Sequence, residues 1–176
     1  INAVLSIVRK QPKQAETALE DMADLFRMAM GEAQNLVPLR QEIQMSKQYL
    51  ALEKLRMGER LQVNWQVADA PLDALIPPLL LQPLLENAVY HGIETLTAGG
   101  EINIVLRRKG KQIELLISNP CKPNDAVKHV GNKLALKNIR ERLELLFDVE
   151  ASYQVEARRD AYKITITLPY LHEGAV

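Results

Sequence analysis

The sequence predicts an α+β protein, in which an N-terminal helical segment is followed by an α/β sandwich with helices on one face of a sheet. Up to Gly58, apolar residues recur at helical spacing, and beyond Gly58 the apolar period changes from 3.6 to 2 residues. Strand-like runs then come in pairs separated by short turns, with helical patterns between them. This order is typical of antiparallel strands backed by helices.

Three helical patterns precede residue 58. The first ends at Pro12, the second ends at Gly31, and the third begins after Val37-Pro38. Short helices with long apolar faces have to pack on something, and a bundle completed by a second chain would bury them. We therefore expect residues 1–58 to be the remainder of a dimerisation region, residues 59–171 to form a second domain and residues 172–176 to be a tail.

The second domain is predicted to have the order β, α, β, β, loop, α, β, β. Pro83 is tolerated only in a first helical turn, which places the first of these helices at about Gln82 to Gly92. A stretch from Asn119 to about Leu134 has no apolar period and is predicted to be a long loop. The other elements are a strand over 61–67, a hairpin turning at 109–111, a helix marked by Leu136, Ile139, Leu143 and Phe147, and a last hairpin turning at 159–160.

The charge balance excludes some classes of partner. The 22 basic and 22 acidic side chains cancel, so no global field favours nucleic acid or an anionic membrane surface. No apolar run approaches the ~18 to 20 residues that span a bilayer, so we expect no membrane contact by this chain itself. The single cysteine fits a reducing compartment, and the start at Ile1, inside an apolar pattern, suggests a piece of a longer protein.

The most specific string is LLLQPLLENAVYHG, at residues 79–92. Asn87 and His91 are four residues apart and share one helix face, while Leu84, Leu85 and Ala88 can supply the buried face. An Asn side-chain oxygen is a hard ligand, suited to a Mg²⁺ ion that also keeps waters and phosphate oxygens. The alternative for Asn87 is a capping or core residue.

This string resembles the N box of the LytS-type sensor histidine kinases, which belong to the GHKL superfamily of gyrase, Hsp90, histidine kinase and MutL. The resemblance covers nearly the whole chain, including LRQEI at 39–43, YLALEKLR at 49–56 and NIRERL at 138–143. It implies a Bergerat-type ATP-binding domain with a mixed, largely antiparallel sheet over 59–171. The phosphoacceptor histidine is then expected just upstream of Ile1, which leaves this chain without a catalytic residue of its own.

The resemblance also implies roles in the N box. Asn87 matches the position that binds Mg²⁺. Tyr90 stands where many members carry a Lys that meets the triphosphate, and it offers one hydrogen bond and no charge. His91 could donate to phosphate or pack on the ribose, or it could serve as a partner of the helix C-terminal dipole.

Both glycine boxes of the family are altered here. Asn119 matches the Asp of an Asp-x-Gly-x-Gly turn that accepts the adenine amino hydrogen, but Pro120 and Cys121 follow it and both glycines are missing. The second box reads GNKLAL at 131–136, so Gly131 is kept, and Lys133 and Leu134 follow where phosphate-facing backbone is expected. Lys133 could clash with the required turn or offer a charge to phosphate. Each segment could also be a structural turn or loop.

The resemblance therefore implies the cytoplasmic part of an inner-membrane sensor kinase, which binds ATP and Mg²⁺ and passes phosphoryl through the upstream histidine to a LytTR-type response regulator. The chain looks most like the alginate and type IV pilus sensors, which suggests alginate biosynthesis as the process. The alternative is a degenerate kinase, acting as a dimeric scaffold or phosphatase partner. A hydrolytic ATPase would need a carboxylate one helical turn before Asn87, where Pro83 stands.

The unpartnered apolar faces before Gly58 predict that the longer protein is a homodimer through its N-terminal helices. Light-scattering mass measurement of a protein that contains these residues and the upstream helix should give twice the chain mass. A strictly monomeric mass would contradict this prediction.

Overall fold

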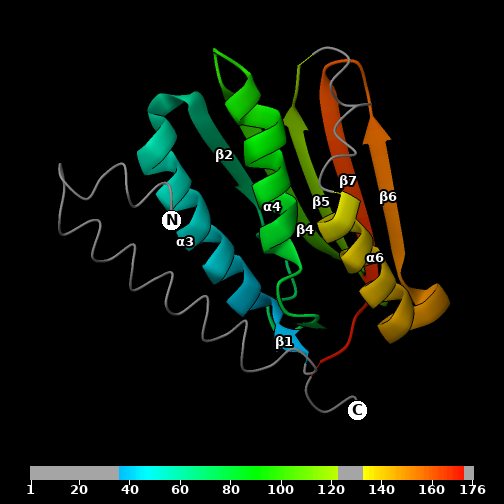
Figure 1. Cartoon of the computed structure of the whole chain (residues 1–176). Coiled ribbons are helices and arrows are strands. Elements are labelled where there is room, and N and C mark those ends of the chain that lie inside the picture. Colours follow the sequence, from blue (N-terminus) through cyan, green and yellow to red (C-terminus); the bar gives the residue numbers. More distant parts are fainter. Residues whose placement is uncertain (1–35, 123–132, 173–176) are drawn as a thin grey trace.

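The computed structural model describes residues 36–122 and 133–172 (Figure 1). The helices predicted before residue 36 and the loop centre at 123–132 lie outside the described residues. The strands and helices are β1 (Val37–Pro38), α3 (Leu39–Met57), β2 (Leu61–Gln66), β3 (Leu75–Ile76), α4 (Leu81–Asn87), β4 (Gly100–Lys109), β5 (Gln112–Pro120), α6 (Lys133–Phe147), β6 (Ser152–Ala157) and β7 (Ala161–Pro169). Short helical segments are η1 (Gly58–Arg60), η2 (Ala88–Gly92), η3 (Ile93–Thr95) and η5 (Asp148–Glu150).

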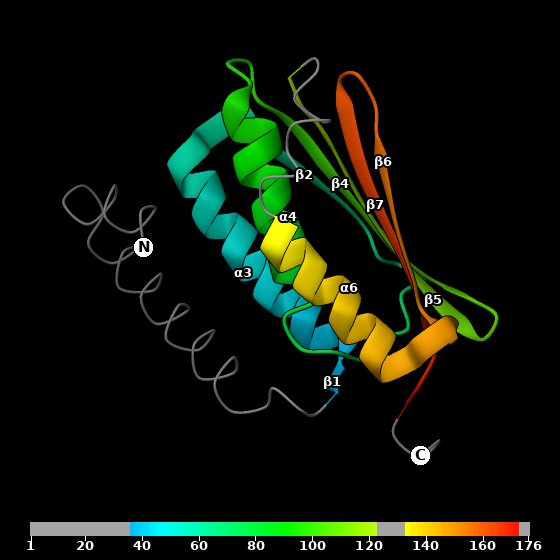
Figure 2. The same ribbon diagram turned by 45° about the vertical axis from the view of Figure 1, so that its right-hand side comes forward.

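The described residues form two layers. The main sheet has five strands in the order β2-β4-β5-β7-β6, with β2 parallel to β4 and the other pairs antiparallel. The helices α3, α4 and α6 lie side by side over one face of this sheet (Figures 1 and 2). The predicted α+β class and the mixed, largely antiparallel sheet are confirmed.

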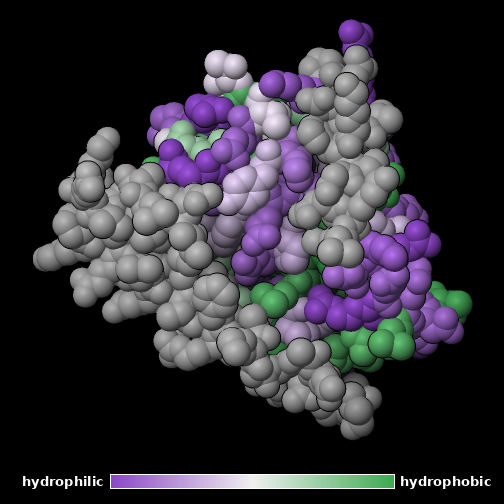
Figure 3. Space-filling model, in the orientation of Figure 1, coloured by the Kyte–Doolittle hydropathy of each residue, from purple (hydrophilic) through white to green (hydrophobic). Residues whose placement is uncertain are grey.

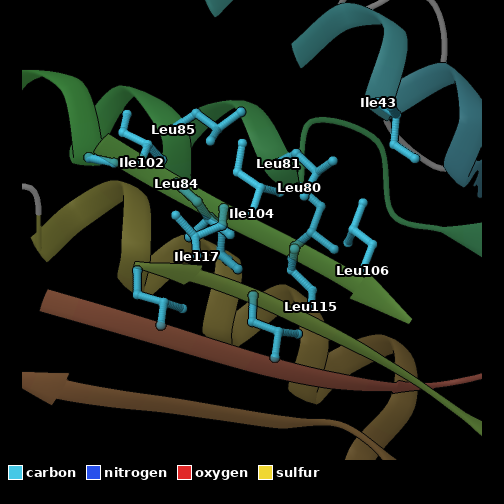
Figure 4. Packing of buried hydrophobic residues seen from close by; sticks show 14 of the residues in the cluster. Ile43, Leu80, Leu81, Leu84, Leu85, Ile102, Ile104, Leu106, Leu115 and Ile117 are labelled. Carbon is cyan, nitrogen blue, oxygen red and sulfur yellow. The ribbon is translucent and has the colours of Figure 1, made fainter. Parts of the chain in front are cut away.

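The core lies between the sheet and the helices. Along β4, β5 and β7 every second residue is buried, as expected for strands with one covered face. Side chains of α4 point toward β4 and β5, so Leu81, Leu84 and Leu85 meet Ile104 and Ile117 (Figure 4). Buried residues of α3 belong to the same hydrophobic cluster, although α3 precedes residue 58. The boundary at residue 58 stays a prediction.

Glu42 of α3 caps α4. No side chain next to the start of α4 caps that helix, but the Glu42 carboxylate accepts the backbone N–H groups of Leu79, Leu80 and Leu81 at 2.7, 3.0 and 3.1 Å. Glu42 is 2% exposed. Burial raises the pKa of Glu42, although the backbone donors and the charge of Arg142 act in the opposite direction. A carboxylate at a helix N-terminus also interacts favourably with the helix dipole, so α3 and α4 are joined electrostatically as well as by packing.

Several predicted boundaries differ from the structure. The helix expected from about Gln82 begins at Leu81, with Pro83 in its first turn, and its last five residues form a π-helical turn instead of an α-helix. The loop expected from Asn119 to about Leu134 is wrong at both ends. Asn119 belongs to β5, where it pairs with Tyr162 of β7, and Lys133 and Leu134 begin α6. The two-stranded sheet of β1 and β3 was not predicted, because two-residue strands carry no periodic pattern.

The membrane prediction can be examined over residues 36–122 and 133–172. No helix in these ranges is long and apolar enough to cross a bilayer.

The Glu42 cap predicts a large effect of Glu42→Ala on stability. Three buried or half-buried N–H groups would lose their acceptor, so we expect the free energy of unfolding to fall by about 2–4 kcal/mol in urea titrations. The matched control Glu101→Ala changes an exposed glutamate of β4 and should cost less than about 0.5 kcal/mol. Equal losses in the two variants would contradict the capping role.

Candidate functional site

The N box spans α4 and the π-helical turn η2. Asn87 is the last residue of α4, and Tyr90 and His91 lie in η2. The turn is closed by the Ile93 N–H group, which donates to the Ala88 carbonyl five residues earlier. Single π-helical turns inside α-helices often occur at functional sites, because they change the direction of the side chains that follow.

Asn87 has an unsatisfied side-chain oxygen. The residue is 4% exposed, and its Oδ1 atom is buried and accepts no hydrogen bond from the part of the chain that the structure describes. Leaving a buried amide oxygen unpaired costs roughly 1–3 kcal/mol, so such atoms in folded proteins usually have a water, an ion or a ligand as partner. The geometry therefore gives Asn87 a free acceptor, as a metal-binding role requires.

Tyr90 faces α3 and contacts Arg56. The Arg56 guanidinium lies 5.6 Å from the centre of the Tyr90 ring, and Tyr90 itself is 42% exposed. Arg56 also forms ion pairs with Glu53 at 2.6 Å and with Glu94 at 2.7 Å. Burial and the charge of Glu53 raise the pKa of Tyr90, while Arg56 lowers it. Tyr90 therefore stands next to a cation whose charge two carboxylates already balance.

Asn119 lies buried at the end of β5, close to the end of the N box. Its Nδ2 atom donates to the Pro120 carbonyl oxygen at 2.9 Å, and the residue is 6% exposed. A carbonyl can only accept, so the amide nitrogen has to face Pro120. This orientation leaves Oδ1 as the acceptor that points elsewhere, which removes the ambiguity of an amide that could present either end.

Two glycines make this arrangement possible, and the sequence alone did not single them out for it. A Cβ atom on Gly92 would lie 2.1 Å from Asn119 Nδ2, and one on Gly100 would lie 2.5 Å from Pro120 Cγ. A side chain at either position would displace the Asn119-Pro120 end of β5. The signal that could have found Gly92 is its place at the end of the N box, where a helix stop was the simpler interpretation.

The remaining predicted site residues are only partly described. His91 is half-buried in η2, one residue before Gly92. Lys133 and Leu134 form the start of α6, but their side chains, like the whole of Gly131, lie outside the described residues. The structure thus brings Asn119 close to the N-box end at Gly92.

The surroundings of the N box suit a polar ligand. In Figure 3 the surface over α4 is mainly hydrophilic, and hydrophobic residues gather instead toward the end of α6, where Leu145 and Val149 are exposed. Within 36–122 and 133–172, no group of three or more His, Cys, Asp or Glu side chains could hold a metal. A Mg²⁺ ion usually keeps several waters and phosphate oxygens as ligands, so a single protein ligand such as Asn87 suits it.

Comparison with known proteins gives the same family as the motifs. The histidine kinase family model matches residues 1–61. Sensor histidine kinase BtsS of Escherichia coli K12 is 30% identical over 99% of this chain. The sensor histidine kinase/phosphatase LytS of Staphylococcus aureus Mu50 is 27% identical over 97% of it. Over nearly its whole length the chain is similar to these two sensor histidine kinases. It spans about a third of the length of these relatives, 31% in each case.

Solved structures of other histidine kinases share the fold of this chain. The histidine kinase domain of the blue-light activated kinase of Erythrobacter litoralis EL346 superposes with a TM-score of 0.59 at 18% identity, over 95% of this chain and 86% of that one. The nucleotide-free catalytic domain of histidine kinase ThkA gives 0.58 at 16% identity, over 78% and 97%. At these identities the likeness shows the fold of a histidine kinase catalytic domain and nothing about ligands.

The amide orientation at Asn119 predicts that Asn119→Asp is destabilising, although it restores the family's residue. A carboxylate oxygen would face the Pro120 carbonyl, so we expect a loss of about 1–3 kcal/mol at pH 7. Burial and this repulsion raise the pKa of the new carboxyl, so the loss should shrink as the pH falls from 7 through that raised pKa and be smallest below about pH 4, the ordinary value of an Asp carboxyl.

Asn103→Asp is the matched control for this change. Asn103 Oδ1 accepts from Asn64 Nδ2 at 2.9 Å, and a carboxylate keeps that bond. Its free energy of unfolding, from urea titration, should stay within about 1 kcal/mol of the parent value. A stable Asn119→Asp chain at pH 7 would show that Pro120 does not fix the amide.

Proposed function

We propose that this chain is the ATP-binding part of a two-component sensor histidine kinase. The observation that carries the proposal is the buried, unpaired Oδ1 of Asn87 in an N-box helix, because a Mg²⁺ ion bound with nucleotide would satisfy it. The relationship to BtsS and LytS and the catalytic-domain fold support the same function.

Each predicted residue has a role in this proposal. Asn119 accepts the adenine amino hydrogen through Oδ1, and its amide nitrogen stays on Pro120. Asn87 ligates Mg²⁺, which when bound would neutralise phosphate charge. Gly131, Lys133 and Leu134 precede or begin α6, where backbone N–H groups at a helix start favour anions. Tyr90 and His91 border the phosphates and contribute hydrogen bonds instead of the usual lysine charge.

Phosphoryl transfer beyond this chain completes the proposal. The acceptor is a histidine upstream of residue 1, and the product is passed to a LytTR-type response regulator. The full protein is then a membrane-anchored homodimer with this part in the cytoplasm, and we propose, from the sequence resemblance to the alginate and type IV pilus sensors, that it acts in alginate biosynthesis. Such transfer relies on positioning and charge neutralisation, so few protein groups are needed.

One observation favours the degenerate-kinase alternative. Tyr90 brings no charge to the phosphate side of the N box, and the cation beside it, Arg56, is already paired with Glu53 and Glu94. The affinity for the triphosphate should therefore be lower than in relatives that carry a lysine at this position. In the limit of no binding, the chain would act as a scaffold or phosphatase partner.

Titration calorimetry with a non-hydrolysable ATP analogue, with and without Mg²⁺, tests the proposal. We expect saturable binding that Mg²⁺ strengthens, and loss of that Mg²⁺-dependent gain in Asn87→Ala. The stability of Asn87→Ala should change by less than about 1 kcal/mol, because Oδ1 has no described partner to lose.

Asn64→Ala is the control for this titration. Asn64 Nδ2 bonds to Asn103 Oδ1 between β2 and β4, so this variant loses a hydrogen bond but should keep nucleotide affinity. No binding by the parent chain up to millimolar nucleotide would support the degenerate kinase. Mg²⁺-dependent binding that survives Asn87→Ala would remove Asn87 from the site.

A further inference from the structure

The backbone of Leu79, just before α4, contacts side chains from two other helices, α3 and α6. The Leu79 N–H group donates to Glu42 Oε1 of α3 at 2.7 Å. The Leu79 carbonyl oxygen lies 3.4 Å from Arg142 Nη2 of α6. Leu79 is thus held from one side by an acidic group and from the other by a basic group, each on a different helix.

Leu79 is strained where these groups hold it. Its φ angle is +54°, in the left-handed region that a bulky residue rarely enters. Such a conformation costs of order 1–3 kcal/mol and persists only where surrounding contacts impose it. Glu42 and Arg142 supply those contacts, because one binds the N–H group and the other faces the carbonyl of the strained residue.

The hydrogen-bonding groups of the Arg142 guanidinium are poorly satisfied, which argues against a role in stability alone. Its Nε atom is buried and has no hydrogen-bond partner among the described residues, and its one described hydrogen bond, to Leu79, is long. Burial lowers the pKa of Arg142, and the charge of Glu42 opposes this effect. A methionine of similar length would fill the same space without an unpaired N–H group.

We propose that Arg142 is a positioning residue, which acts through the Leu79 peptide and the Glu42 cap to fix α6 against α4. The two helices are the ones that carry predicted site residues, Asn87 at the end of α4 and Lys133 and Leu134 at the start of α6. The distance between α4 and α6 would decide whether the metal ligand on α4 and the phosphate-binding groups on α6 reach the same nucleotide. This inference rests on the proposed nucleotide site.

The experiment compares Arg142→Met with Arg140→Met in the full chain. Arg140 is the matched control, since it lies on the same helix, is exposed and pairs with Glu144 at 2.8 Å. The affinity for adenosine and for the ATP analogue is measured by calorimetry, the latter with and without Mg²⁺. Adenosine reports only the base subsite at Asn119, which α6 spacing should not change.

Arg142→Met should weaken binding of the Mg²⁺-loaded analogue by about five- to tenfold, a usual size for coupling between sites, and leave adenosine affinity unchanged. Arg142→Lys keeps the charge beside Glu42 and should recover part of the loss. Arg140→Met should match the parent. The proposal is overturned if Arg142→Met weakens adenosine and analogue equally, or if it behaves as Arg140→Met does.

A second measurement separates this inference from the proposed function. If the parent chain binds no nucleotide, the nucleotide proposal fails, and the junction is tested by unfolding Glu42→Gln, Arg142→Met and the double variant. Two results together would support coupling between Glu42 and Arg142. The effects of the two single variants on the unfolding equilibrium constant would be non-additive by at least about threefold, and Arg142→Met would show faster hydrogen exchange at Leu79 to Leu81. Additive effects and unchanged exchange overturn it.

Discussion

The arrangement of the helices depends on one buried carboxylate. The start of α4 follows a turn that contains Pro78 and Leu79 and has no cap of its own, so the N–H groups of residues 79–81 would be unsatisfied in this largely buried place. Glu42 accepts them from α3, 37 to 39 residues earlier in the chain. Because Glu42 accepts backbone N–H groups, the cap needs an acidic side chain at this position of α3 but no particular side chains at the start of α4. The helix α4 can therefore begin at a buried residue, Leu81, and it ends at Asn87.

At the β5 end of the site, Asn119 and Pro120 pack closely against the backbone of two neighbouring segments. Pro120 and Cys121 stand where the family has a flexible turn, yet Asn119 is held as the last pair but one of a regular strand. The space that the side chains of Asn119 and Pro120 need comes from Gly92 and Gly100 on neighbouring segments. The Asn119-Pro120 segment thus depends on two residues without a side chain on the elements that face it.

The sequence predicted the class, the order of elements and the mixed sheet, because long alternating strands such as β4 and β7 and the amphipathic α6 leave a clear period. It did not predict what depends on contacts between distant segments. The Glu42 cap, the contacts of the strained Leu79 and the Gly92–Asn119 approach join residues that are 27 to 63 positions apart. At the site, the resemblance to the family's motifs selected Asn87 and Asn119, and only the structure showed that Asn87 Oδ1 is unpaired among the described residues and that the Asn119 amide nitrogen donates to Pro120.

The π-helical turn has a consequence for comparing this chain with its relatives. A wider turn rotates each following side chain by less than an α-helix does, so Tyr90 and His91 leave the helix in directions that a regular helix would not give them. Two residues in the same alignment column can then project into different places. In this chain the turn is followed by a tyrosine that meets Arg56 of α3, so its ring direction cannot be read from its place in the sequence alone.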